Sequence, residues 1–217
     1  MTYVGREAAP GAPELQSASP SECAESKGTR GRIGAYGLGW LLSGVSVLLV
    51  SLAVAPGVEG VLGGALGLAM LGVAWVDGRR FIVPNALSGG AFALGVIHAF
   101  VQSPDSGFEA VLTACSRAAF AAGLFFLVRI AYRRFRGRDG LGLGDVKLAA
   151  AAGAWLSLTM LPVAIEIAAI TALAAYVLRQ GSRRRVLRAA GRVPFGAFLA
   201  PAIWFGWVLD TMLPTLT

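Results

Sequence analysis

Charged side chains are scarce in this chain, and so are cysteine and histidine. Asp, Glu, Lys and Arg make up 14% of its 217 residues, whereas soluble domains carry about 25%. This deficit, together with a hydrophobic fraction of 56%, excludes an ordinary soluble domain and predicts an integral membrane protein. The two cysteines lie far apart and there is one histidine. They provide neither a disulfide framework nor a paired-cysteine metal site, and we expect no metal and no cofactor.

The first 34 residues have no apolar core. They are rich in Ala, Pro, Ser, Gly and Glu and show no helical periodicity. Such a composition is typical of a disordered tail and not of a cleavable signal peptide. We therefore expect a tail over residues 1–34 and a membrane-embedded domain over 35–217.

Seven apolar segments fill the rest of the chain. A membrane-spanning helix needs about 20 residues, so the sequence predicts an all-α, polytopic membrane helix bundle of about seven transmembrane helices. The expected segments are 36–55, 57–76, 86–102, 109–131, 146–160, 162–178 and 194–213. The fifth is the shortest, and we expect Pro162 to separate it from the sixth, because proline ends or begins a helix.

Basic residues concentrate in alternate connections. They lie before the first segment and after the second, fourth and sixth, whereas the other connections and the C-terminal end contain no Lys or Arg. The positive-inside rule then predicts a cytoplasmic N-terminus and a C-terminus on the outer side of the membrane. The net charge of +7 reflects this topology and an attraction to membrane lipid. It requires no nucleic acid.

Two aspartates stand at the ends of apolar segments. Asp77 follows the second segment, and Asp145 precedes the fifth in the motif Gly142-Leu-Gly144-Asp145. Two expected spans separate them, so both lie at the same membrane face. Adjacent carboxylates share one proton, which allows one to activate water while the other protonates a substrate carbonyl. Gly142 and Gly144 would let an extended substrate approach the backbone.

Simpler interpretations of these aspartates stay open at this point. Asp145 alone is a favourable helix N-cap. Asp77 alone is an interfacial residue that ends a helix beside Gly78. Their occurrence together at one face favours function, since ionisable residues within a membrane domain are functional candidates by default.

Five other ionisable residues have weaker functional signals. Arg117 and Glu166, both within expected spans, favour a structural pair. His98 favours packing near the outer end of its span, and Asp210 is expected to be solvated. Arg129 is expected to extend toward the cytoplasmic surface.

Three segments resemble signatures of the type IV prepilin peptidases. Asp77-Gly-Arg-Arg-Phe-Ile-Val-Pro84-Asn85 resembles their first signature, and Gly142-Leu-Gly-Asp-Val-Lys147-Leu is similar to their GxGD motif. Pro194-Phe195-Gly196 is similar to the segment that opens their last core helix. The three occur in the same order and cover roughly residues 55–210. The resemblance implies a six-helix core and an aspartic endopeptidase that removes the basic leader from prepilins or pseudopilins at the cytoplasmic membrane face.

The resemblance also implies roles for individual residues. Asp77 and Asp145 would be the catalytic pair, and Gly142 and Gly144 would shape the cleft. The supporting residues would be Pro84, Asn85, Lys147, Pro194, Phe195 and Gly196. Position 197 is Ala where many relatives have Pro.

One departure from the family concerns a second domain. Larger members carry a methyltransferase domain with paired cysteines, and this chain has no Cys-x-x-Cys. Its connections are also short, so we expect a compact, peptidase-only member like those that serve Flp-type pili.

Two other functions fit a membrane bundle with two aspartates. An intramembrane protease of the presenilin or signal-peptide-peptidase kind would carry Tyr-Asp and Pro-Ala-Leu elements, and neither is present. A proton- or cation-coupled transporter would favour carboxylates deep in the spans and internal repeats. The sequence shows no such repeat.

Overall fold

The computed structural model describes residues 38–137, 140–182 and 194–213. The expected tail over 1–34 lies outside these residues. The described residues form helices and connecting turns with no strand among them, which confirms the all-α prediction. The chain divides into two compact units, 1–42 and 43–217. The described residues of the first unit, 38–42, are helical and belong to a helix over Leu38–Val54.

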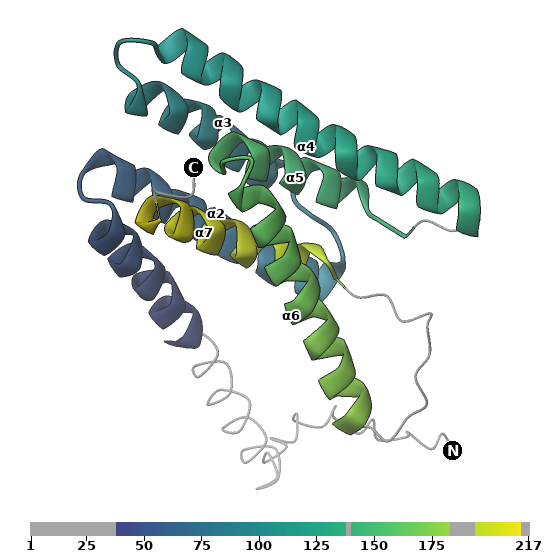
Figure 1. Ribbon diagram of the computed structural model, residues 1–217. Coiled ribbons are helices and arrows are strands. Elements are labelled where there is room, and N and C mark those ends of the chain that lie inside the picture. Colours follow the sequence, from purple (N-terminus) through teal and green to yellow (C-terminus); the bar gives the residue numbers. More distant parts are fainter. Residues whose placement is uncertain (1–37, 138–139, 183–193, 214–217) are drawn as a thin grey trace, which may run out of the picture. The chain divides into compact units, whose positions relative to one another are not determined.

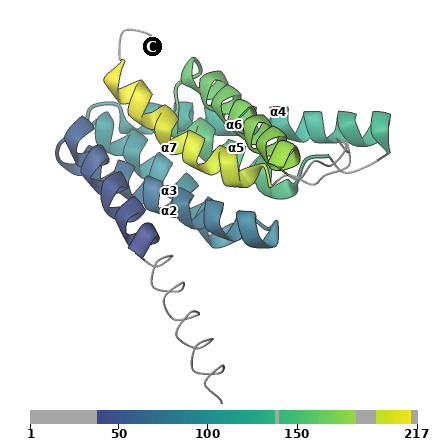
Figure 2. The same ribbon diagram turned by 90° about the horizontal axis from the view of Figure 1, so that it is seen from below.

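Six further helices follow in the second unit. They are α2 (Val58–Arg80), α3 (Asn85–Gln102), α4 (Gly107–Arg136), α5 (Leu143–Trp155), α6 (Met160–Ser182) and α7 (Gly196–Met212). Helix α4 lies along α3 and α5, and α7 packs against α2 and α6 (Figures 1 and 2). Helix α3 also contacts α2 and α5. These contacts place the starts of α3, α5 and α7 close to the end of α2.

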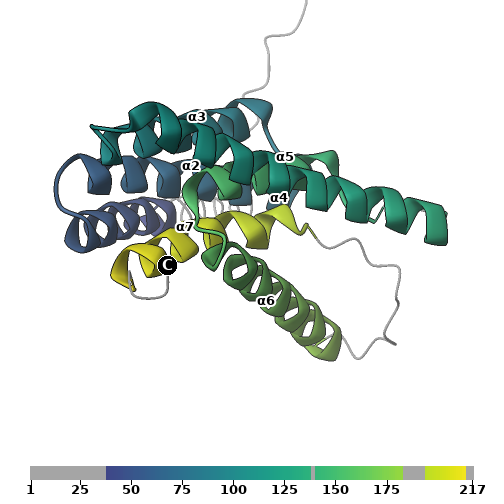
Figure 3. The ribbon, with the colours of Figure 1, turned by 45° about the horizontal axis from the view of Figure 1, so that its top comes forward.

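Several helices are long and apolar enough to cross a membrane. Among the described residues these are Val58–Arg80, Gly107–Arg136 and Met160–Arg179, and Leu38–Val54 and α7 are shorter apolar helices. Figure 3 shows the C-terminal part of α6 extending away from the other labelled helices, and most of its side chains there are exposed. Apolar side chains that no other helix covers are what a lipid-facing helix presents. The chain is a polytopic helical membrane protein.

Helix α5 differs from the expected fifth segment. It begins at Leu143 and ends at Trp155, so the predicted range 146–160 and the break at Pro162 are wrong. Pro162 instead lies in the first turn of α6, where its missing N–H has no intrahelical partner to lose. The 13 residues of α5 extend about 20 Å, which is less than the roughly 30 Å of bilayer hydrocarbon. Nearly every residue of its second half is buried, so α5 is an interior helix.

Small residues allow α5 to approach its neighbour closely. A Cβ at Gly153 would lie 2.5 Å from the Arg117 carbonyl oxygen and 2.8 Å from the Cα of Ala118, both in α4. Only glycine permits backbones this close, as is common where membrane helices pack. The α4–α5 contact therefore fixes the height of α5 within the bundle.

Candidate functional site

Asp77 lies in the last turn of α2 and not beyond it. The expected segment 57–76 is too short, since the helix continues to Arg80. The helix ends at Phe81, which has φ 54° and ψ 35° and donates its N–H to the Asp77 carbonyl oxygen at 2.9 Å. This left-handed conformation is unusual for a residue with a side chain. It turns the chain sharply directly after Asp77, whose side chain is 5% exposed.

The first turn of α7 holds the Asp77 carboxylate. The Ala197 N–H donates to Asp77 Oδ2 at 2.8 Å. A Cβ at Gly196 would lie 2.9 Å from the same oxygen and 3.2 Å from Cγ. Gly196 therefore leaves the space that the carboxylate occupies. The free N–H groups of a helix N-terminus favour a negative charge, and a proline at position 197 could not donate this hydrogen bond.

Asp145 lies in the first turn of α5. Gly142, not Asp145, is the N-cap residue. The Gly142 N–H donates to Asp145 Oδ2 at 3.2 Å, and the Asp145 N–H donates to the Gly142 carbonyl oxygen at 3.2 Å. This is the acidic half of a capping box. The N-cap interpretation of Asp145 was therefore wrong in position, although the carboxylate does contribute to the helix start.

The pKa of Asp145 depends on its burial and on the charge of Asp77. Asp145 is 8% exposed and lies outside the three candidate spans. The pKa of its carboxyl group is raised to about 6, mainly by burial and to a lesser degree by the Asp77 charge, against the lowering effect of the Gly142 N–H. The charge of Asp77 therefore acts on Asp145, although the two residues come from different helices.

Val83 connects all three signature segments. It is buried and lies between two glycines of different helices. A Cβ at Gly144 would lie 2.7 Å from the Val83 Cβ, and one at Gly196 would lie 3.2 Å from its Cγ2. The sequence analysis did not single out Val83. The available signal was its position as the apolar residue before Pro84-Asn85.

Two of the expected supporting residues meet directly. Lys147 Nζ donates to Asn85 Oδ1 at 2.6 Å, which links α5 to the start of α3. Pro84 is the N-cap residue of α3, and its carbonyl oxygen accepts a hydrogen bond from Ser88 Oγ at 3.2 Å. Phe195 packs against the buried core, and the Pro194 carbonyl oxygen accepts the Ala197 N–H at 3.2 Å.

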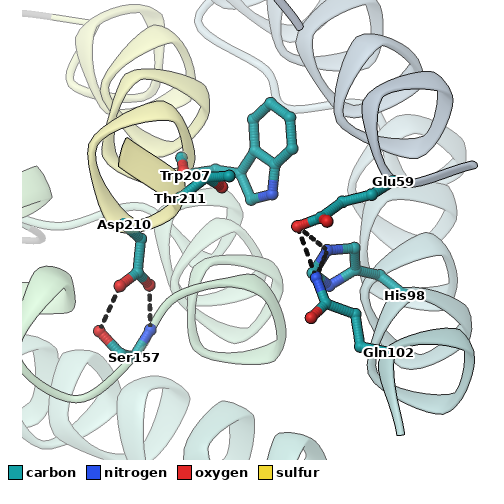
Figure 4. Close-up of polar contacts among 7 residues, drawn as sticks. All are labelled: Glu59, His98, Gln102, Ser157, Trp207, Asp210 and Thr211. Carbon is teal, nitrogen blue, oxygen red and sulfur yellow. Dashed lines mark hydrogen bonds and ion pairs between the residues drawn. The ribbon is translucent and has the colours of Figure 1, made fainter. Parts of the chain in front are cut away.

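The structure changes the interpretation of four other ionisable residues. Glu166 is exposed on α6, and in the described part of the chain no ion pair joins it to Arg117, so the predicted pair was wrong. Arg129 donates to the Leu141 carbonyl oxygen at 2.7 Å and holds the loop before α5. Asp210 is not simply solvated, since it accepts hydrogen bonds from the N–H and Oγ of Ser157 (Figure 4).

His98 packs as expected but also has a polar partner. Its ring stacks on Trp155 with centroids 4.7 Å apart. Its Nε2 lies 3.7 Å from Glu59 Oε1 (Figure 4). No group of three or more His, Cys, Asp or Glu in the described ranges is arranged to hold a metal ion.

Comparison with known proteins gives a consistent result. The model of the type IV leader peptidase family matches residues 64–177. The leader peptidase HopD of Escherichia coli is 33% identical over 147 residues, which cover 67% of this chain and 90% of HopD. No solved structure gives a significant match.

Longer relatives match as well. A prepilin leader peptidase/N-methyltransferase of Dickeya chrysanthemi is 33% identical over 184 residues, and one of Neisseria gonorrhoeae is 28% identical over 151 residues. These alignments cover 82% and 69% of this chain. The chain spans 60% and 48% of the length of these two relatives.

Proposed function

Because this chain belongs to the type IV leader peptidase family, we propose that it is an aspartic endopeptidase that cleaves the leader from prepilin or pseudopilin precursors. The observation that carries the proposal is the pair Asp77 and Asp145. They come from different helices, both are buried, and each accepts a backbone N–H. The proposed location is the inner membrane, with the pair at the cytoplasmic face because the basic connections lie at that end.

The proposed reaction uses one proton shared by the two carboxyl groups. The ionised aspartate takes a proton from water while the water oxygen attacks the scissile carbonyl carbon. The protonated aspartate donates its proton to the carbonyl oxygen. When the C–N bond breaks, the first aspartate gives its proton to the leaving amine, and a hydroxyl of the diol intermediate returns a proton to the second aspartate as the new carboxyl group forms. The pair titrates as a unit, so the resting proton belongs to the pair.

The surrounding residues position this pair. The Ala197 N–H stabilises the ionised form of Asp77 by a charge-assisted hydrogen bond. Val83 lies between Gly144 of α5 and Gly196 of α7. It therefore sets the distance between the start of α5, which carries Asp145, and the start of α7, which contacts Asp77. The Lys147–Asn85 hydrogen bond ties α5 to α3 beside the pair. We propose that Gly142 and Gly144 leave room for an extended peptide.

The decisive experiment replaces each aspartate with asparagine. The Asn side-chain oxygen can still accept the N–H of Ala197 or Gly142, so the local hydrogen bonds persist while the ionisable group is lost. Co-expression with a prepilin precursor, followed by N-terminal sequencing, should show processing by the wild type and none by Asp77→Asn or Asp145→Asn. Asp105→Asn, at an exposed site, is the matched control and should process normally. Cleavage by either active-pair variant contradicts the mechanism.

Two finer parts of the function are also proposals. The Flp-type substrate rests on the sequence resemblance alone. Peptidase activity without methyl transfer is supported by the match to HopD, which is named a leader peptidase and is covered over 90% of its length. Nothing in the reported matches supports the transporter alternative, since each matched relative is named a leader peptidase.

A further inference from the structure

A polar cavity lies at the other end of α2 from the aspartate pair. Its volume is about 420 Å³, and α3, α4 and the C-terminal end of α5 line it. The lining includes His98, Gln102, Glu109, Thr113, Arg117 and Trp155. Glu59, which contacts His98 and Gln102, begins α2, whereas Asp77 lies about 27 Å farther along that helix at 1.5 Å per residue. The cavity is therefore separate from the candidate active site.

The guanidinium of Arg117 is the cation of this cavity. Its Nε atom is buried and has no hydrogen-bond partner among the described residues. No ion pair joins Arg117 to a carboxylate in the same part of the chain. Arg117 is half-buried, and a buried donor such as its Nε is costly to leave without a partner. Arginine presents a planar fork that fits phosphate or carboxylate oxygens. The Nε atom without a partner and the position of Arg117 in the cavity lining together point to an anionic ligand.

The nearby carboxylates are already engaged (Figure 4). Asp210 accepts two hydrogen bonds from Ser157, at 2.8 and 3.0 Å. Glu59 accepts the Gln102 amide at 2.6 Å and lies 3.7 Å from His98 Nε2. Glu109 lies two turns before Arg117 in α4, about 12 Å along the axis. The Asp210 charge acts on Arg117 from a distance, but no carboxylate of the described residues forms an ion pair with this guanidinium.

Two adjacent stripes on α4 indicate where the ligand comes from. Glu109, Thr113 and Arg117, spaced four residues apart, line the cavity and form one stripe of the helix. Phe120 and Leu124, three and seven residues beyond Arg117, continue the same face of α4 toward the middle of the span and are 60% and 43% exposed. A polar cavity with an uncovered apolar stripe on its bilayer side matches a lipid, whose headgroup is polar and whose chains are not. A free anion in water would gain nothing from Phe120 and Leu124.

We propose that this cavity binds the headgroup of a membrane phospholipid, with its phosphate on Arg117. The hydroxyl groups of Ser103 and Ser106 also line the cavity and can donate to phosphate oxygens. Glu109 on the same wall accepts the amine of a zwitterionic headgroup, so phosphatidylethanolamine is the lipid that fits best. The acyl chains then lie along Phe120 and Leu124, deeper in the span than Arg117. The proposal does not depend on the peptidase function.

Native mass spectrometry of the full chain in detergent tests the proposal. The wild type, titrated with phosphatidylethanolamine, should retain bound lipid. Arg117→Gln should weaken this binding at least about tenfold, because a charge-assisted hydrogen bond is lost. Arg134→Gln removes the same charge from an exposed position near the other end of α4 and should bind lipid as the wild type does. Millimolar inorganic phosphate should not displace the lipid.

A second variant covers a failure of Arg117→Gln to fold. Ala110→Leu places a larger apolar side chain in the cavity lining without changing the charge, and it should also reduce lipid retention. If Arg117→Gln folds and binds the lipid as tightly as the wild type does, the proposal is overturned. If Arg117→Gln does not fold, wild-type lipid affinity of Ala110→Leu overturns it instead. Displacement by inorganic phosphate would show a free-anion site and would overturn the lipid assignment.

Discussion

Replacing Asp145 with asparagine should stabilise the protein at neutral pH. Burial raises the pKa of this carboxyl group from 3.8 to about 6. The folded state therefore binds the proton more tightly than the unfolded state. The contribution of Asp145 to stability is fully present below about pH 4, falls as the pH rises from 4 to 6, and is lost above that window. The difference of about two pKa units corresponds to about 3 kcal/mol, a cost that Asp145→Asn removes.

The structural alternative predicts no gain in stability. If Asp145 served only to begin α5, Asp145→Asn would keep the oxygen that accepts the Gly142 N–H and would leave the stability nearly unchanged, because Asn and Asp are similarly good at helix starts. If burial instead disfavours the charge of Asp145, replacing it with a neutral side chain stabilises the folded protein. At 2–4 °C per kcal/mol for a chain of this size, the expected rise in the unfolding temperature at pH 7.5 is about 6 to 12 °C.

The assay is thermal unfolding in detergent at pH 7.5 and pH 4. Asp145→Asn should unfold at a higher temperature than the wild type at pH 7.5 and at nearly the same temperature at pH 4. Asp105→Asn controls for the loss of one negative charge and should show no pH-dependent gain. A lower unfolding temperature for Asp145→Asn at both pH values would refute the reasoning.

Three further substitutions and one pH profile test the geometry around the pair. Gly196→Ala should lower processing about 100-fold, because the new Cβ would lie 2.9 Å from Asp77 Oδ2 and misplace the carboxylate; Gly90→Ala, whose Cβ meets nothing within 4 Å, should not. Ala197→Pro should lower processing most at acidic pH, because the ionised form of Asp77 loses its N–H donor. Ala197→Gly keeps this donor and is the control. Equal pH profiles of processing for the two variants would exclude a role for the hydrogen bond. Lys147→Met should lower the free energy of unfolding by about 1 kcal/mol. A double-mutant cycle with Asn85→Ala should show coupling between the two residues, and additive changes in the free energy of unfolding would contradict the hydrogen bond. Wild-type processing should fall as the pH rises above about 6, because the pair then loses its shared proton, as the raised pKa of about 6 for Asp145 indicates. A rate that stays level to pH 8 would contradict a shared proton in the mechanism.

Much of the fold could be predicted from local features of the sequence. Helices α3, α4 and α7 lie close to the expected apolar segments, because a run of apolar residues in a membrane forms a helix wherever it occurs. The family was also predicted correctly, since each signature is a short local pattern. Helix α5 was predicted less well. Its end depends on the interior packing of Gly153 and Trp155 against other helices, which no local apolar run records.

The polar contacts required the tertiary structure. Arg117 and Glu166 were expected to pair because both are ionisable residues within apolar segments. Glu166 instead lies exposed on α6, which packs against α7 and not against α4. The Asp210–Ser157 contact joins residues 53 positions apart. Sequence spacing does not indicate which faces of two distant helices meet.

The sequence by itself determined that this protein is a helical membrane protein of the leader peptidase family and that Asp77 and Asp145 are its candidate pair. These conclusions follow from composition, apolar runs and short motifs, which are properties of neighbouring residues. The tertiary structure alone decided that Ala197 donates to Asp77, that Val83 separates Gly144 from Gly196, and that Arg117 lines a polar cavity. The physical reason is that such contacts depend on the rotation and height of each helix, which close packing around small residues sets across the whole bundle.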